Sequence, residues 1–159
     1  VTVDYTNTLT MQQESPKITF DPEQQVAAQT TSRTYSNGEL SMTVTYPPRL
    51  PSDTTDFDVE TQLTDAGPGR VVSRSRIGCT GRCATIDYTG SLKTAAGFSE
   101  SGGSCGTARF LEGKDTVTTN CEFTGGDPGD TITTHNFRAT ASYGYQLHRE
   151  LPLQVVVDN

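Results

Sequence analysis

The chain has 159 residues and a formal net charge of −7, from 12 basic and 19 acidic side chains. This length fits a single β-sandwich domain over residues 1–159, large enough to bury a core. The acidic excess argues against a nucleic-acid partner, because nucleic acids bind basic surfaces. We expect no membrane insertion, since no apolar run approaches the roughly 20 residues that a spanning helix needs.

Apolar and polar residues alternate strictly along much of the chain, which predicts antiparallel strands, because neighbouring strand side chains point to opposite faces. The opening strand covers residues 1–11 and ends at a polar segment. Its apolar residues share one face, namely Val1, Val3, Tyr5, Leu9 and Met11.

A short strand is predicted at 17–20, and residues 24–29 fit either a strand or a helical turn. Asn37-Gly38 is a tight-turn signal, and it leads into a strand at 39–46. Prolines in the segment 47–51 are expected to end that strand, because proline cannot donate a ladder hydrogen bond.

The second half continues in the same way. The alternation predicts further strands at 57–63, 71–77, 84–88, 116–123, 131–145 and 151–157, with a flexible small-residue loop at 97–103. Turn signals recur at the spacing typical of an all-β sandwich.

Three of these segments resemble the closing strands of immunoglobulin-like sandwiches in microbial surface proteins. They are Val-Thr-Thr-Asn-Cys-Glu-Phe at 117–123, Ala-Thr-Ala-Ser-Tyr-Gly-Tyr at 139–145, and the strand at 151–157. The chain has no Trp, so it departs from the Cys–Trp–Cys core of antibody domains. The resemblance implies an immunoglobulin-like architecture and nothing narrower.

Four cysteines, Cys79, Cys83, Cys105 and Cys121, allow three disulfide pairings. A hairpin of 105–111 with 115–123 would place Cys105 opposite Cys121, close enough for a disulfide. Cys79 and Cys83 would then close a small loop turned by Gly81. The fold class expected from the sequence is therefore an all-β, disulfide-stapled antiparallel β-sandwich.

A zinc site is the rival interpretation of these cysteines. Structural zinc sites usually pair two Cys-x2-Cys knuckles, and the spacings here do not match that pattern. We therefore expect disulfides, no metal and no cofactor. Disulfides persist in oxidising compartments, so we expect an extracellular or cell-surface protein.

Candidate catalytic and metal-binding side chains are few. His135 and His148 lie in strand-like segments without a nucleophile motif, and we interpret them as strand histidines. Asp53, Asp56, Asp58 and Glu60 could bind Ca²⁺, as could Asp127 and Asp130. The alternation favours the solvent face of a strand for the first group and turns for the second.

Tyr143 and Tyr145 share one face of a predicted strand. They could stack on a sugar ring, but packing in the core explains the same pattern, and we favour the core. The loop at 97–103 is the segment most suited to binding a sugar or protein ligand.

The opening strand either completes its own sheet, which we favour, or is donated to a neighbouring subunit. We expect no enzymatic activity. The function we expect is structural: a homo-oligomer or polymer, as the repeating subunit of a surface filament, a pilus or a similar assembly joined by β-strand contacts. The alternatives are an adhesin-like binding module with a glycan or protein ligand and a viral capsid or spike component.

Overall fold

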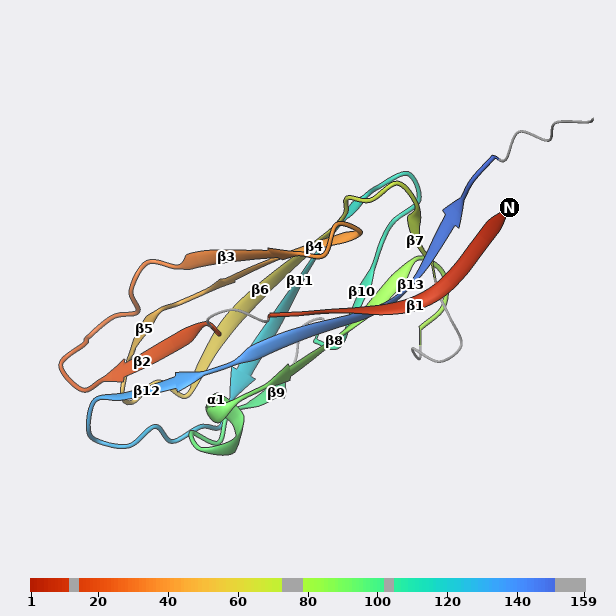
Figure 1. Ribbon diagram of the computed structural model, residues 1–159. Coiled ribbons are helices and arrows are strands. Elements are labelled where there is room, and N and C mark those ends of the chain that lie inside the picture. The colour runs from red at the N-terminus through yellow and green to blue at the C-terminus, as the bar shows by residue number, and fades with distance from the viewer. Residues whose placement is uncertain (12–14, 73–78, 102–104, 151–159) are drawn as a thin grey trace, which may run out of the picture.

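The computed structural model describes residues 1–11, 15–72, 79–101 and 105–150. These residues form strands almost throughout, with one short helix (Figure 1). No helix in this described part is long and apolar enough to cross a membrane. The elements in chain order are β1 (Thr2–Thr10), β2 (Lys17–Asp21), β3 (Thr31–Ser36), β4 (Leu40–Tyr46), β5 (Arg49–Pro51), β6 (Asp56–Asp65), β7 (Arg70–Val72), β8 (Cys83–Thr89), α1 (Ser91–Thr94), β9 (Ser99–Ser101), β10 (Thr107–Arg109), β11 (Thr116–Thr124), β12 (Thr133–Asn136) and β13 (Arg138–His148).

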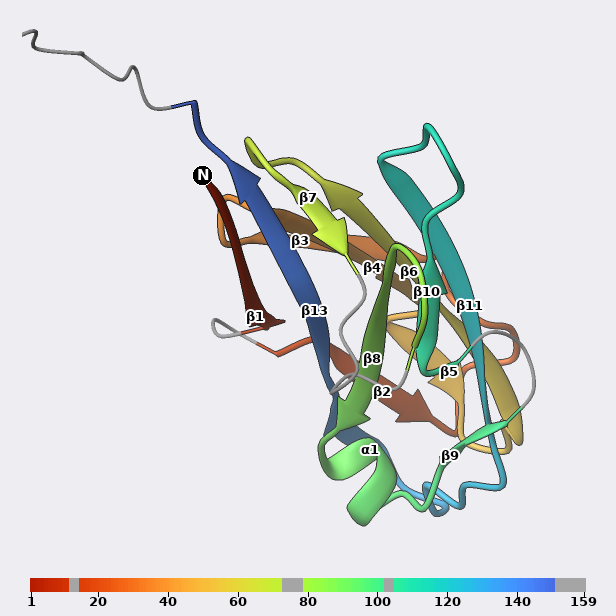
Figure 2. The ribbon, with the colours of Figure 1, turned by 90° about the vertical axis from the view of Figure 1, so that its right-hand side faces the viewer.

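The strands form two facing sheets and a smaller third one, which confirms the predicted all-β sandwich (Figures 1 and 2). The first sheet has the order β1-β13-β8-β10, with β7 also paired to β13. The second has the order β3-β4-β6-β11-β9, and the third is β12-β2-β5. Every pairing is antiparallel except that of β2 with β5, which run parallel.

The alternation of apolar and polar residues along the strands determines which side chains form the core. In β4 and β6 the buried side chains include Met42, Val44, Val59 and Leu63, while the residues that alternate with them, such as Glu60 and Gln62, face outward. A strand with one buried face holds its register firmly, because a one-residue slip would turn the whole apolar set into solvent. The Asn37-Gly38 turn joins β3 to β4 as expected, with Gly38 at a φ of 88°.

Aromatic rings connect the three sheets. Phe20 of the third sheet lies 6.4 Å from Phe57 of the second, measured between ring centroids. Phe57 stacks on Phe123 at 5.5 Å, and Phe123 meets Tyr88 of the first sheet at 5.4 Å. Such ring pairs contribute about 0.5–1.5 kcal/mol each beyond the area they bury. The small third sheet is therefore part of the same core.

Both disulfides join the expected partners, Cys79 with Cys83 and Cys105 with Cys121. The hairpin behind the second prediction is wrong, however. β10 pairs with β8 in the first sheet, whereas β11 pairs with β6 and β9 in the second. The Cys105–Cys121 disulfide therefore links the two sheets across the sandwich, with its Cα atoms 4.7 Å apart.

The strand predicted at 131–145 is two strands in different sheets. The chain changes sheets at the buried Phe137, so β12 pairs with β2 and β13 pairs with β1 and β8. The alternation of exposed and buried residues runs through this point without a break. The sequence pattern therefore carries no sign of the switch.

Three shorter segments also differ from expectation. Residues 24–29 form neither strand nor helix. β4 ends at Tyr46, directly before the prolines, as expected, but 49–51 then forms the short strand β5. Part of the expected loop at 97–103 is strand β9, because its backbone extends the second sheet beside β11. The predicted strand at 151–157 and most of that at 71–77 lie outside the described residues.

Candidate functional site

The two long sides of the sandwich are closed differently. On one side the Cys105–Cys121 disulfide ties the end of the first sheet to β11. On the other side the edge strands β1 and β3 lie next to each other without a covalent link. This second side, which we call the open side, is the candidate functional site, because it carries the opening strand.

β1 completes its own sheet by pairing with β13 from Thr2 to Thr10 without a bulge. The N-terminal amine of Val1 donates to the Arg149 carbonyl at 2.8 Å, and the Arg149 N–H donates back at 2.9 Å. At the other end, the Met11 N–H donates to the Ala139 carbonyl at 3.3 Å. Hydrogen-bonded pairs alternate along an antiparallel ladder, so the odd-numbered residues bond to β13.

The even-numbered residues of β1, such as Thr2, Thr6 and Thr10, therefore direct their backbone groups away from β13. No strand in the described part of the chain pairs with this outer edge. Thr2 to Thr10 include no Lys, Arg or Pro, the residues with which proteins usually protect a sheet edge. β1 is thus a long and regular edge whose single charge, Asp4, lies toward its N-terminal end.

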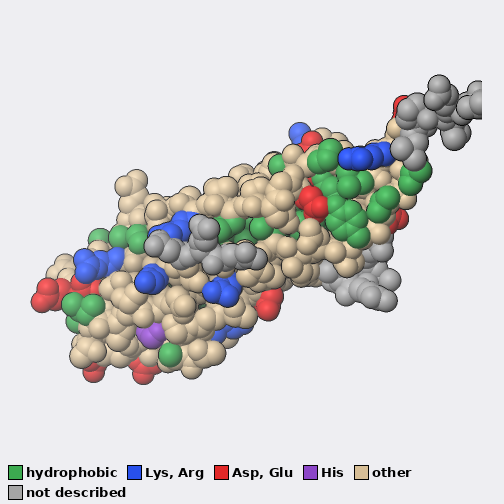
Figure 3. Space-filling model, viewed as in Figure 1, with side chains coloured by type: hydrophobic (Ala, Val, Ile, Leu, Met, Phe, Trp, Pro, Cys, Tyr) green, Lys and Arg blue, Asp and Glu red, His purple; other side chains and the backbone are tan. Residues whose placement is uncertain are grey.

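The five apolar residues of the opening strand share one face, as expected, but they lie at different depths. Leu9 and Met11 are in the core, and Tyr5 is half-buried. Val1 and Val3 are 65% and 50% exposed, because this end of β1 and β13 projects beyond the second sheet (Figure 1). Hydrophobic side chains gather on the surface over this end (Figure 3).

A carboxylate holds β1 against the second sheet. Glu39, just before β4, accepts hydrogen bonds from the Tyr5 hydroxyl, from Asn7 Nδ2 at 2.9 Å and from the Tyr143 hydroxyl at 2.9 Å. Asn37 Nδ2 donates in turn to the Tyr143 hydroxyl at 2.6 Å. We call these five residues the Glu39 clasp; it closes the open side with hydrogen bonds alone.

The charges of the clasp follow from its contacts. Burial by itself would raise the pKa of Glu39, but the bonds from Tyr5, Asn7 and Tyr143 outweigh it and lower that pKa below its ordinary value. The bond to Glu39 raises the pKa of Tyr5 to about 12, with burial and the negative charge of Glu39 adding to the effect. Burial chiefly raises the pKa of Tyr143 as well. The clasp thus keeps an ionised carboxylate between neutral phenols.

The edge of β3, unlike that of β1, carries an inward-facing charged residue. Arg33 lies opposite the buried Val44, on the side of the strand that faces the core, and its side chain is exposed at the rim. A charged residue pointing inward from an edge strand disfavours the addition of another strand. Of the two edges on the open side, β1 is the one without such protection.

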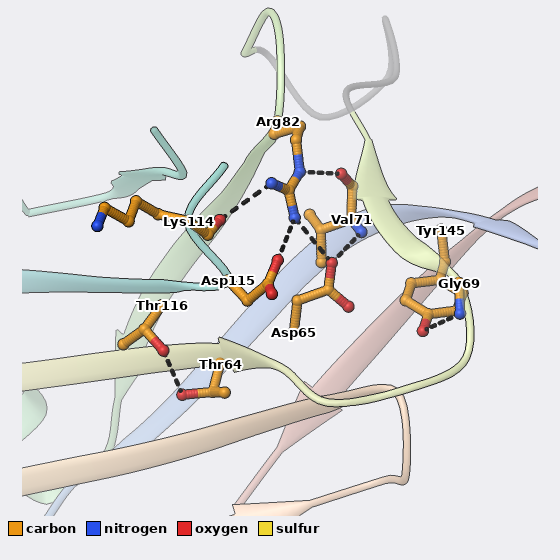
Figure 4. A network of polar contacts seen from close by, with 9 residues as sticks. All are labelled: Thr64, Asp65, Gly69, Val71, Arg82, Lys114, Asp115, Thr116 and Tyr145. Carbon is orange, nitrogen blue, oxygen red and sulfur yellow. Dashed lines mark hydrogen bonds and ion pairs between the residues drawn. The ribbon is translucent and has the colours of Figure 1, made fainter. Parts of the chain in front are cut away.

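Near Glu39, Arg82 of the small disulfide loop ties several elements together (Figure 4). Its guanidinium bonds to Asp65 at 3.0 Å, to Asp115 at 3.3 Å, and to the carbonyls of Val71 and Lys114 at 3.3 and 3.0 Å. It also lies 5.5 Å above the Phe110 ring. The arginine thus serves to join the strand ends.

The sequence candidates for catalysis lie far apart. His135 is in β12 and His148 is at the end of β13, at opposite ends of the molecule (Figure 1). His135 packs against Phe20, and its Nε2 is buried without a partner among the described residues. His148 is exposed, with Nδ1 3.2 Å from the Thr2 hydroxyl.

The acidic residues considered as Ca²⁺ ligands lie on the solvent face of a strand and in a turn, as the sequence pattern favoured. Asp56, Asp58 and Glu60 lie on the exposed face of β6, and Asp127 accepts the Gly129 N–H at 3.1 Å inside a turn. The described residues contain no group of three or more His, Cys, Asp or Glu side chains placed to hold a metal ion.

Tyr143 and Tyr145 are both in the core, which confirms the favoured interpretation. Their rings meet edge to face at 6.2 Å, and the Tyr145 hydroxyl accepts the Gly69 N–H at 3.0 Å. Neither ring offers a face to a sugar.

A hollow of about 360 Å³ lies where β2, β3 and the end of β4 meet. Lys17 and Arg33 supply positive charge to its wall, and hydroxyl groups and a tyrosine line the rest. Its full lining is Ser15, Lys17, Thr31, Ser32, Arg33, Tyr46 and Pro48. No pattern in the sequence indicates this hollow, because its residues come from three separate segments.

Comparison of the chain with protein-family models, with curated proteins and with solved structures finds no match.

Proposed function

We propose that this chain is a non-enzymatic, extracellular structural protein: the repeating subunit of a surface filament or similar assembly whose subunits join through β-strand contacts. The observation that carries the proposal is the edge of β1, nine residues long with no Lys, Arg or Pro and with Asp4 as its single charged residue. Exposed backbone donors and acceptors along such an edge are a template for another strand.

Two further features support the proposal. The two disulfides suit an oxidising environment outside the cytosol. The exposed Val1 and Val3 add apolar surface next to the same edge. Apolar surface beside an open edge favours association, because both are then removed from water.

Electron microscopy of the purified chain tests this function, with Thr6→Lys and Thr118→Lys as matched variants. Both substitutions add one lysine to an exposed strand position, but Thr118 lies in β11 of the second sheet, opposite Gln62 of β6 and away from the β1 edge. We expect particles larger than one subunit in the unmodified chain and in Thr118→Lys. Thr6→Lys should weaken assembly by about tenfold, because the charge is placed in the middle of the edge. Single subunits in every sample would overturn the proposal.

A binding module is the second candidate, supported by the hollow beside Lys17 and Arg33. Its volume suits one or two sugar rings, and its positive charge favours an acidic glycan. A glycan array with the unmodified chain and Lys17→Ala tests it. Signal on acidic glycans that Lys17→Ala removes would favour this function, and an empty array would exclude it for the glycans displayed.

A further inference from the structure

We infer that β1 pairs with β1 of a second copy of this chain, antiparallel and centred on Thr6. The inference rests on the proposed function and specifies its joint. Such a pair would continue the first sheet of one copy into the first sheet of the other. The residues that decide the geometry are those of the outer edge of β1.

The backbone restricts the alignment of the two strands. Even-numbered residues of β1 face the outer edge, so hydrogen-bonded pairs across the joint must match even with even residues. The two residue numbers in each pair therefore have an even sum. This requirement rejects every alignment that sets an even residue opposite an odd one.

Charge and overlap select among the remaining alignments. An alignment centred on residue 4 would set Asp4 directly opposite Asp4 of the second copy, and like charges in that position repel. The alignment centred on Thr6 spans the whole of β1 and separates these two charges. It places Thr6 opposite Thr6, Thr2 opposite Thr10 and Asp4 opposite Thr8, so threonines provide most of the outward-facing pairs.

One existing bond must be exchanged. The Thr8 N–H already donates to Oδ1 of its neighbour Asn7 at 2.9 Å. At the joint this N–H would donate instead to the carbonyl of residue 4 in the second copy. The Thr8 N–H still makes one hydrogen bond, its carbonyl gains one from the N–H of residue 4, and Asn7 Nδ2 keeps its bond to Glu39.

Edge pairing fits this structure better than donation of the strand. A donated β1 would have to leave its ladder with β13, withdraw Leu9 and Met11 from the core and break the Glu39 clasp. Edge pairing keeps all of these contacts. It also favours β1 over β3, since Arg33 protects the β3 edge.

The pair has twofold symmetry and uses the same surface of both copies. A joint of this kind closes on itself, so it produces pairs of subunits, and growth beyond the pair requires another surface. The building block of the proposed assembly is then a dimer whose first sheets are continuous.

Cysteine cross-linking tests the alignment. Thr6→Cys brings two cysteines opposite each other across the joint, within the Cα separation that a disulfide spans. Thr8→Cys is the matched control on the same edge, because its two cysteines would be four residues out of register. Thr34→Cys is the control on the edge of β3. Thr6, Thr8 and Thr34 are all exposed, so the fold should accept each substitution.

We expect mild oxidation to give about tenfold more covalent dimer with Thr6→Cys than with either control. Mass spectrometry should identify the residue 6 to residue 6 cross-link and leave both native disulfides in place. More dimer with Thr8→Cys or Thr34→Cys would overturn the alignment or the choice of edge.

Light scattering on the unmodified chain distinguishes a failure of the β1–β1 joint from a failure of the proposed function. Assembly of the unmodified chain without a Thr6→Cys cross-link would refute the joint but leave the structural function standing. A strictly monomeric unmodified chain would refute both.

Discussion

Replacement of Arg82 tests how the strand ends around Asp65 are held together. The guanidinium contacts two carboxylates in very different surroundings: the Asp65 side chain is 3% exposed and the Asp115 side chain is 74% exposed. Asp65 also accepts the Val71 N–H at 2.7 Å, while its Oδ1 is buried with no partner among the described residues. Arg82→Met would therefore leave a buried carboxylate with one hydrogen bond (Figure 4).

The expected loss of stability follows from that difference. Removing one partner of a buried ion pair costs about 3–5 kcal/mol, and the 22% exposure of Arg82 lets water relieve part of it. We expect about 3 kcal/mol for Arg82→Met. Asp115→Asn removes only the exposed half of the network, and we expect less than about 1 kcal/mol, because exposed pairs contribute little.

Urea unfolding at neutral pH measures both variants against the unmodified chain. The double variant Arg82→Met with Asp65→Asn identifies the cause, because it also removes the stranded charge. We expect the double variant to be at least as stable as Arg82→Met alone. If Arg82→Met and Asp115→Asn are equally stable, or if the double variant loses the sum of two large effects, the reasoning is wrong.

Two further predictions concern the clasp and the disulfides. The folded-state pKa of Glu39 is lowered, so its contribution to stability is present above the unfolded pKa and is lost as the pH falls through the folded value. Glu39→Gln should flatten the acid limb of a pH-stability curve. It should also lower the pKa of Tyr5 from about 12, as measured by ultraviolet titration of the phenols; an unchanged titration would contradict the clasp. Replacing Cys105 and Cys121 by alanine should cost about 3 kcal/mol in urea unfolding, against about 2 kcal/mol for Cys79 and Cys83, because the longer loop restricts the unfolded chain more. A reversed order would contradict that account.

Local patterns in the sequence predicted the strands but not how they meet. β4 was predictable because Leu40, Met42 and Val44 alternate with hydroxyl side chains between two turn signals. β3 was not, since an edge strand with polar residues on both faces has no alternation to detect. The change of sheet at Phe137 was hidden because the alternation continues through it.

The candidate site was only half predictable for a similar reason. The opening strand and its shared apolar face were evident in the sequence, and the cysteine partners were predicted correctly from a wrong hairpin. The Glu39 clasp joins residues 5, 7, 37, 39 and 143, and the Arg82 network joins residues 65, 71, 82, 114 and 115. These contacts form only when packing brings distant strands together, so no local sequence pattern predicts them.

Assembly through the edge of β1 is the central claim, and the molar mass of the chain in solution tests it most directly. Light scattering should be recorded over a range of concentrations for the unmodified chain and for Thr6→Lys. We predict a mass above the 17.1 kDa of one chain that rises with concentration for the unmodified protein, and the same rise for Thr6→Lys only at about tenfold higher concentration. A constant 17.1 kDa for the unmodified protein, or equal assembly of the two, would contradict the account.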